Sequence, residues 1–146
     1  MQFNDRKERR STANQLIDNM LNERKQLLAL LLQTSNLVPG DAERSDNDLL
    51  EEFCQVLVDY IAAGHFGLYE RISQGKEKRR TVADLANTVY PKIEESTQIA
   101  LEFSSKYNPE RIKTGLNNLQ KDLSVLGEAL TTRIELEDQL ISKMLK

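Results

Sequence analysis

One histidine and 23 carboxylates are the residues of this 146-residue chain that could hold a metal ion or move a proton. A di-metal site in a helical bundle needs Glu-x-x-His pairs on two helices, and His65 is the single histidine. Glu70, the next acid along the chain, is five positions away, which is the wrong spacing for that motif. We therefore expect His65 to be a hydrogen-bonded structural residue beside the core, and we predict no catalytic residue, metal ion or cofactor.

A metal-binding bundle that pairs His65 with Glu137 or Asp138 is the first alternative function. Helices rise 1.5 Å per residue, so a last helix that begins near Asn108 would place Glu137 ~42 Å down its length. His65 would lie about 28 Å below the turn between the first two helices. The two side chains would then lie at different levels of the bundle, which argues against a shared site.

Two basic clusters, within residues 6–10 and 76–80, make nucleic-acid binding the second alternative function. Neither cluster is interleaved with aromatic residues that would stack on bases, and the net charge of the chain is −3. We interpret both clusters as solvated charge. In an up-down-up-down bundle, Glu135, Glu137 and Asp138 near the end of the chain would lie close enough to neutralise them.

An acidic stripe is the most informative surface feature of the sequence. At 100° per residue, five side chains of the second predicted helix fall on the face opposite Leu50, Leu57 and Leu68. They are Asp48, Glu52, Asp59, Phe66 and Glu70. Phe66 either packs under another element or is exposed as an anchor, and the helical wheel allows both. An exposed anchor among acids suits a basic partner with an apolar pocket, such as a DNA-binding domain.

The elements that position these residues are amphipathic helices. The chain is 39% apolar and 29% charged but only 5% aromatic with no Trp, which favours helices over sheets. Apolar spacing predicts helices over about 4–35, 45–75, 81–107 and 108–144, with Pro39-Gly40, residues 76–80 and Asn108-Pro109 as boundaries. The expected fold is all-α, a single domain over residues 1–146 built as an antiparallel four-helix bundle. Pro91 should kink the third helix, and a break there would give five or six helices.

The inward faces of these helices follow from the same spacing. In the first helix the predicted core residues are Ala13, Leu16, Ile17, Met20, Leu21, Leu28 and Leu31. In the second they are Leu50, Phe53, Cys54, Leu57, Ile61, Gly64, Leu68 and Ile72, with His65 beside them. Cys54, the single cysteine, is expected to be a buried thiol.

The leucine-rich run over residues 27–32 bears on both membranes and assembly. It is far shorter than the ~20 residues needed to cross a bilayer, and the charged N-terminal segment lacks the layout of a signal peptide. We therefore expect a cytoplasmic protein without a membrane partner. Leucines in this run point around most of the helix, so dimerisation through them stays an alternative to the monomer that we expect.

A resemblance to a known family rests on the segment from Phe53 to Arg71. Its pieces Phe53-Cys54-Gln55, Leu57-Val58-Asp59-Tyr60, Ala63-Gly64-His65-Phe66 and Tyr69-Glu70-Arg71 resemble the signature of the regulator of sigma D family, also called Rsd/AlgQ. Supporting pieces are Arg24-Lys25-x-Leu27-Leu28, Tyr90-Pro91-x-Ile93-Glu94 with Thr97, Gly127-Glu128-Ala129-Leu130 and Leu136-Glu137-Asp138. The resemblance covers nearly the whole chain.

The resemblance implies a non-enzymatic helical bundle that acts as an anti-sigma factor in the bacterial cytoplasm. Such a protein binds the primary sigma factor, mainly its C-terminal promoter-recognition domain, and withholds it from core RNA polymerase in stationary phase. The motif's aspartate falls on Asp59, which the resemblance identifies as a sigma-contacting acid, with Phe66 and Glu52 as its neighbours. The chain departs from the family pattern in helix one, which lacks the tryptophan often found near Met20, and in ending soon after Ile141.

Overall fold

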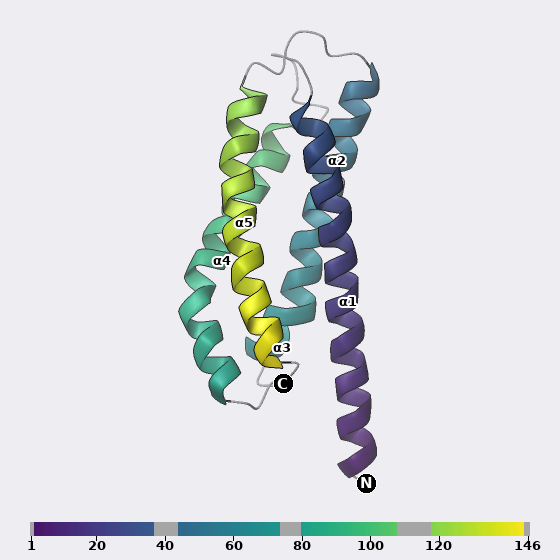
Figure 1. The fold of residues 1–146 in the computed structure, drawn as a ribbon, viewed down its shortest axis with the longest axis vertical. Coiled ribbons are helices and arrows are strands. Elements are labelled where there is room, and N and C mark those ends of the chain that lie inside the picture. The colour runs from purple at the N-terminus through teal and green to yellow at the C-terminus, as the bar shows by residue number, and fades with distance from the viewer. Residues whose placement is uncertain (1, 37–43, 74–79, 108–117, 145–146) are drawn as a thin grey trace.

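The computed structural model describes residues 2–36, 44–73, 80–107 and 118–144, with the backbone alone at 2–14, 44–47, 71 and 73 (Figure 1). Its four long helices are α1 (Gln2–Ser35), α2 (Arg44–Gly64), α4 (Arg80–Lys106) and α5 (Leu119–Met144). A π-helical turn, η1 (His65–Tyr69), and the short α3 (Glu70–Ser73) continue α2. The described part of the chain contains no strand, so the all-α prediction is confirmed.

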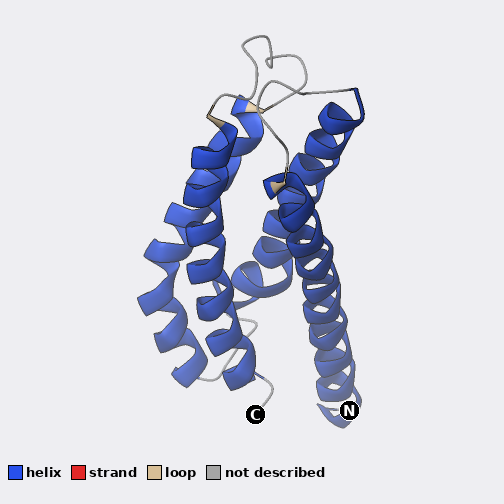
Figure 2. Ribbon diagram, turned by 45° about the horizontal axis from the view of Figure 1, so that its top comes forward, coloured by secondary structure: helices blue, strands red, loops and turns tan. Residues whose placement is uncertain are grey.

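The long helices run up, down, up and down, as Figure 1 shows, and form the expected antiparallel bundle. The closest packing joins α1 to α2 and α4 to α5, and these two pairs stand side by side in Figure 2. α2 also packs against α4, and α5 against α1. α2 and α5 therefore lie diagonally across the bundle, with their outer faces on opposite sides of the molecule.

The core is one apolar cluster to which every long helix contributes. Within this cluster the ring of Phe53 on α2 meets that of Phe103 on α4 edge-to-face, with centroids 5.7 Å apart. The inward face predicted for α2 is confirmed, and Cys54 is buried there. Burial raises the pKa of the Cys54 thiol to about 12, because the thiolate would lose its hydration.

The inward face predicted for α1 was partly wrong. Leu27 and Leu30 are buried, whereas Leu28 is 43% exposed and Leu31 is only partly buried. Met20, Leu27 and Thr34 are buried at intervals of seven, which is the repeat that keeps one seam of a helix against its neighbours in a bundle. The apolar spacing used for the prediction assumes 3.6 residues per turn, and a face with that period drifts away from a seven-residue seam. Ala13 lies outside the described side chains.

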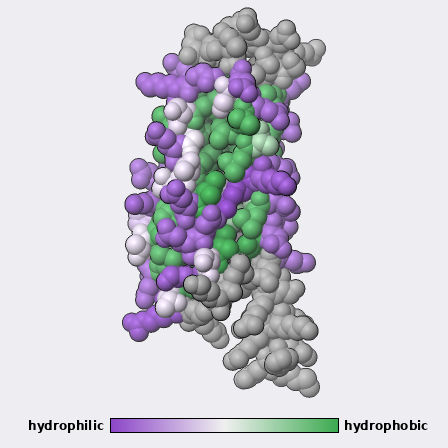
Figure 3. Space-filling model, in the orientation of Figure 1, coloured by the Kyte–Doolittle hydropathy of each residue, from purple (hydrophilic) through white to green (hydrophobic). Residues whose placement is uncertain are grey.

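The seam between α1 and α5 is the more open side of the bundle. Figure 3 shows an apolar strip along it, interrupted near its middle by hydrophilic atoms. Leu28 and Leu32 on α1 are exposed, the latter at 69%. The leucine-rich run is therefore divided between core and surface, and the expectation of a monomer stays a prediction.

α4 continues through Pro91 without a break, so the alternative of five or six helices split at this proline is wrong. A proline removes one backbone hydrogen bond, here to the carbonyl of Asn87, and its ring crowds the preceding turn. Val89 and Ile93 are buried on either side of Pro91 and hold both halves of the helix against the core. The predicted boundaries at Pro39-Gly40, residues 76–79 and Asn108-Pro109 lie outside the described residues.

The π-helical turn is the feature of this fold that the sequence did not predict. The N–H of Glu70 donates to the carbonyl of His65, five residues back, so the turn holds one residue more than an α-helical turn. Gly67, Leu68 and Tyr69 are consequently all buried. A Cβ on Gly67 would lie 3.3 Å from both Cβ and the carbonyl oxygen of Leu16, so glycine favours this close approach of η1 to α1.

No helix within the described residues is long and apolar enough to cross a membrane.

Candidate functional site

The acidic stripe predicted on α2 lies on the surface of the bundle. Asp48, Glu52 and Asp59 are exposed, and Glu70, the residue directly after η1, is partly buried. Phe66 is 61% exposed, which decides between the two placements that the helical wheel allowed. Asp59 accepts a hydrogen bond of 3.1 Å from the Gln55 amide. The stripe is thus an acidic surface with one large aromatic side chain, and its role in binding stays a prediction.

His65 is exposed, so the expectation of a structural histidine beside the core was wrong. The π-helical turn begins at this residue, and Gly67, Leu68 and Tyr69 take the inward positions that follow. The imidazole instead meets the Phe66 ring edge-to-face at 5.0 Å between centroids. His65 therefore belongs to the surface that carries the acidic stripe.

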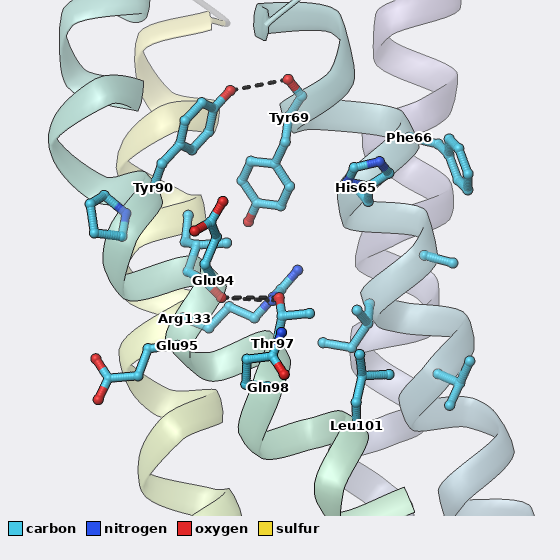
Figure 4. A pocket seen from close by; sticks show the side chains of 15 residues that line it. His65, Phe66, Tyr69, Tyr90, Glu94, Glu95, Thr97, Gln98, Leu101 and Arg133 are labelled. Carbon is cyan, nitrogen blue, oxygen red and sulfur yellow. Dashed lines mark hydrogen bonds between the residues drawn. The ribbon is translucent and has the colours of Figure 1, made fainter. Parts of the chain in front are cut away.

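A groove of about 940 Å³ lies beside the stripe, between α2–η1 and α4. Figure 4 shows His65, Phe66 and Tyr69 on one side of it and Tyr90, Glu94, Thr97, Gln98 and Leu101 of α4 on the other. Arg133 of α5 reaches between the two helices to form the floor. The Tyr90 hydroxyl donates to the carbonyl of Tyr69 at 3.0 Å and joins α4 to η1 at one end.

Glu137 on α5 is the centre of a buried charge network directly behind this groove. Its side chain is fully buried, and its carboxylate accepts hydrogen bonds from Tyr60, from Tyr69 at 2.7 Å, from Arg24 at 3.3 Å and from Arg133 at 3.3 Å. These four donors come from α1, α2, η1 and α5. A buried carboxylate is tolerated only when it is paired and hydrogen-bonded in this way.

The two tyrosines of this network act as hydrogen-bond donors. Burial, followed by the negative charge of Glu137, raises the pKa of both the Tyr60 and the Tyr69 hydroxyls well above its usual range. Both phenols therefore stay protonated and donate to the carboxylate. Glu137, the acceptor of these hydrogen bonds, is fully buried and out of reach of solvent.

Arg133 links the network to α4. Its guanidinium donates to Thr97 Oγ1 at 2.7 Å and to Ser96 Oγ at 3.1 Å, and only 1% of its side chain is exposed. It also lies 5.5 Å from the centre of the Tyr69 ring and 5.8 Å from that of Tyr60, within cation–π range. With Glu137 beside it, Arg133 is a satisfied charge and ties α4, α5 and η1 together.

Two of the acids near the end of the chain, Glu137 and Asp138, have a partner that the sequence did not predict. Arg24 donates to Asp138 at 2.7 Å and to Glu137 at 3.3 Å, so these acids pair with the middle of α1. Burial alone would lower the pKa of Arg24, but its hydrogen bond to Asp138 and its contacts with Tyr60 and Glu137 outweigh burial and raise it. The basic side chains within residues 6–10 and 76–79 lie outside the described part.

His65 and Glu137 lie at similar levels of the bundle, so the predicted difference in level was also wrong. A Cβ on Gly64, which precedes His65, would lie 3.0 Å from Glu137 Oε2. The described part of α5 begins at Leu119, so Glu137 is ~27 Å along it, and Gly64 is ~30 Å along α2. Burial separates the two groups instead: Glu137 faces the interior and His65 faces solvent. Among the described residues, no three His, Cys, Asp or Glu side chains are placed to hold a metal ion.

Sequence reasoning missed Arg24 and Arg133 as interior residues, although a signal was present. Arg24 follows Ile17 and precedes Leu31 by seven positions each, so it occupies a core position of the heptad repeat. Arg133 and Glu137 continue the buried row that runs from Leu126 and Leu130. A charged residue among the inward-facing apolar positions of one helix indicates a buried ion pair when another inward-facing position carries the opposite charge.

Fold and surface together define a class: a helical bundle with a closed, charge-paired interior and an exposed acidic face that carries an aromatic side chain. The chain belongs to the family described as regulator of RNA polymerase sigma(70) subunit, Rsd/AlgQ, which matches residues 1–145. The resemblance found in the sequence is thereby confirmed, and the role of this family is a regulatory one.

Individual relatives agree with the family assignment. The regulator of sigma D of Shigella boydii serotype 4 is 36% identical over 147 residues, covering 96% of this chain and 90% of the relative. The proteins of the same name from Shigella dysenteriae serotype 1 and from Escherichia coli are 35% identical with the same coverage. The family match over residues 1–145 spans α1, the acidic stripe, and Arg133 and Glu137 on α5.

Proposed function

We propose that this protein is an anti-sigma factor of the bacterial cytoplasm. It binds the primary sigma factor, mainly through the C-terminal promoter-recognition domain of sigma, and withholds sigma from core RNA polymerase in stationary phase. It acts as a monomer and by stoichiometric binding, without catalysis, cofactor or direct contact with nucleic acid. The family's name supports sigma as the partner, and the surface of α2 supports how it is bound.

The observation that carries the proposal is the exposed acidic stripe with Phe66 in it. The promoter-recognition domain of sigma is a basic helix-turn-helix module, so acids such as Asp59 and Glu52 would steer it onto this face. Burial of an aromatic side chain supplies affinity that exposed ion pairs do not. Phe66 is therefore the proposed anchor, and the acids set orientation and choice of partner.

Sequestration follows from competition for one basic surface. A helix-turn-helix domain uses its basic side chains to contact phosphates, and those contacts fix its position on the promoter. Acids of the stripe would occupy the same side chains while sigma is bound. The affinity should then fall as salt rises, because exposed charge pairs are screened.

Titration calorimetry of the whole chain against the C-terminal domain of its own primary sigma factor tests this function. We expect one-to-one binding that the Asp59→Ala substitution weakens by about ten-fold, or ~1.4 kcal/mol. Glu128→Ala is the matched control, because Glu128 is an exposed acid on α5, diagonally across the bundle. Absence of binding would contradict the anti-sigma function, and equal loss in both variants would contradict the assignment of the face.

A second experiment separates binding from sequestration. Labelled sigma is mixed with core RNA polymerase and increasing amounts of this protein, and the holoenzyme is quantified by native gel electrophoresis. If this protein sequesters sigma, the amount of holoenzyme should fall as the amount of the complex between sigma and this chain rises. A stable complex of all three components would contradict sequestration and leave sigma binding intact.

A further inference from the structure

The groove between α2–η1 and α4 gathers exposed apolar side chains. Among the large apolar residues that are exposed in the described part, Val58, Phe66 and Leu101 all line this groove, with exposed fractions of 37%, 61% and 43%. Exposed apolar residues scattered singly need no explanation, but three around one concave surface indicate a binding site. Phe66 also belongs to the acidic stripe, so groove and stripe meet at this residue.

The charges around the groove are acidic. Glu94 and Glu95 of α4 line it and are exposed, and Asp59 of the stripe follows Val58 directly in α2. The cation on the floor, Arg133, is already paired with Glu137 and is 1% exposed, so it presents little positive charge to a ligand. An anionic ligand or an anionic membrane surface would meet the two glutamates first. A cationic ligand with an apolar side matches this combination.

The dimensions of the groove match one short helix. On α4 it extends from Tyr90 to Leu101, which is ~16 Å of helix at 1.5 Å per residue. An occupant lying along it would need about three helical turns. A groove between two helices that carries exposed apolar side chains is a usual receptor for an amphipathic helix, which inserts residues spaced at i, i+3 or i+4, and i+7.

We propose that this groove seats an amphipathic helix of a partner protein, with apolar residues toward Val58, Phe66 and Leu101 and lysine or arginine toward Glu94 and Glu95. The inference rests on the proposed function in one respect: the helix would belong to the C-terminal domain of sigma. The docking surface then extends from the acidic stripe around the side of α2 and includes the wall of α4, with Phe66 at the junction.

A designed peptide tests the groove without sigma. The probe is a fluorescent 15-residue peptide of Leu and Lys in amphipathic helical order, and its control is a scrambled peptide of the same composition. We expect fluorescence anisotropy to show that the ordered peptide binds the whole chain and that Val58→Ala with Leu101→Ala weakens it about ten-fold. Leu32→Ala with Val125→Ala is the matched control, because it removes the same two residue types from exposed positions outside the groove.

The two acids that line the groove, Glu94 and Glu95, are tested by a second matched pair of variants. Glu94→Gln with Glu95→Gln should weaken binding of the ordered peptide and reduce its dependence on salt. Glu128→Gln with Glu135→Gln changes the same number of exposed acids on α5 and should leave both unchanged. Thermal unfolding of each variant checks that it is folded. No binding of the ordered peptide, or equal effects within either matched pair, would overturn the groove as a helix site.

The same variants measured against the sigma domain separate this inference from the proposed function. Loss of sigma binding in the Val58 and Leu101 double variant, as in Asp59→Ala, places a sigma helix in the groove. Sigma binding that only Asp59→Ala weakens would overturn the assignment of sigma to the groove and leave the anti-sigma function standing. Self-association that the groove variant abolishes would identify a second copy of the chain as the occupant and would also overturn the proposal.

Discussion

Glu137 on α5 and Asp59 on α2 are carboxylates in opposite surroundings. Glu137 is fully buried and accepts hydrogen bonds from two tyrosines and two arginines, whereas Asp59 is exposed and accepts one hydrogen bond from Gln55. Solvent screens Asp59, so its charge contributes little to the fold and is available to a partner. Removing a member of the Glu137 network would leave uncompensated charge in the interior. Buried charge in this bundle joins the helices to one another, and the exposed charge on α2 is the charge that we propose for recognition.

The network also supports the face that is proposed to bind. Tyr69 donates to Glu137 on the inner side, and Gly64 lies so close to the network that an added Cβ would meet Glu137 and Arg133. Between Gly64 and Tyr69 in sequence, His65 and Phe66 lie on the outer side. The π-helical turn is thus held from within at both ends. The orientation of Phe66 follows from contacts that Phe66 itself does not make.

Breaking the network at its centre should have the largest effect. Glu137→Ala removes the acceptor of four hydrogen bonds and leaves two buried arginines without it, so we expect the free energy of unfolding to fall by about 3–5 kcal/mol. Urea denaturation measures this change. Glu135→Ala, at an exposed position of the same helix, should change stability by no more than about 0.5 kcal/mol. A similar loss of stability in Glu137→Ala and Glu135→Ala would contradict the distinction between buried and exposed carboxylates.

The same substitution at two glycines, Gly64 and Gly127, should change stability in opposite directions, and this sharpens the comparison of buried and exposed sites. In Gly64→Ala the new Cβ would lie 3.0 Å from Glu137 Oε2 and 3.3 Å from an Arg133 nitrogen, and neither bonded side chain can move cheaply. Overpacking of about 1–3 kcal/mol should outweigh the gain in helix propensity of about 1 kcal/mol, so stability falls. In Gly127→Ala nothing lies within 4 Å of the new Cβ, and stability should rise by about 0.5–1 kcal/mol. Thermal unfolding measures both changes, and a stabilised Gly64→Ala or a destabilised Gly127→Ala would contradict the prediction.

Asp122 on α5 stands between the two extremes, with 26% of its side chain exposed. Partial burial favours a higher pKa, but Lys106 at 2.7 Å and the Tyr107 hydroxyl at 2.5 Å outweigh it and lower the pKa of this carboxyl. A lowered pKa in the folded state contributes stability above the unfolded value of 3.8, and this is lost as pH falls through the folded pKa.

The stability difference between wild type and Asp122→Asn should therefore shrink from about pH 5 to about pH 2. Urea denaturation at several pH values measures it. Repeating the pair in a Lys106→Met background should reduce both the difference and its dependence on pH. A difference that persists at the lowest pH would show that charge on Asp122 is not the cause.

The smallest effect on folding is expected at the proposed binding face. Asp59→Ala should change the free energy of unfolding by no more than about 0.5 kcal/mol, because an exposed acid with one amide partner contributes little. The same variant should bind the sigma domain about ten-fold more weakly, so stability and affinity separate at this residue. Strong destabilisation by Asp59→Ala would make Asp59 a structural residue and remove the contrast with Glu137.

Prediction from the sequence succeeded where one helix decided the outcome. The inward face of α2 was predicted correctly because its apolar residues and its acids lie on opposite faces of the helix, so a single orientation buries the apolar residues. In α1 the run over residues 27–32 is nearly all leucine, and spacing alone does not choose between Leu27 and Leu28. His65 was misplaced because a periodic wheel has no place for the extra residue of a π-helical turn.

By itself, the sequence determined the four long helices, their antiparallel order and the acidic stripe with Phe66, because these depend on residue types repeated within single helices and on short connections between them. Tertiary structure alone decided the charge network and the groove. Arg24 and Glu137 are 113 positions apart, and the walls of the groove come from two helices. The reason is physical: the energy of a charge or of an apolar side chain depends on its burial, and burial is set by whichever neighbours the packed helices bring to it.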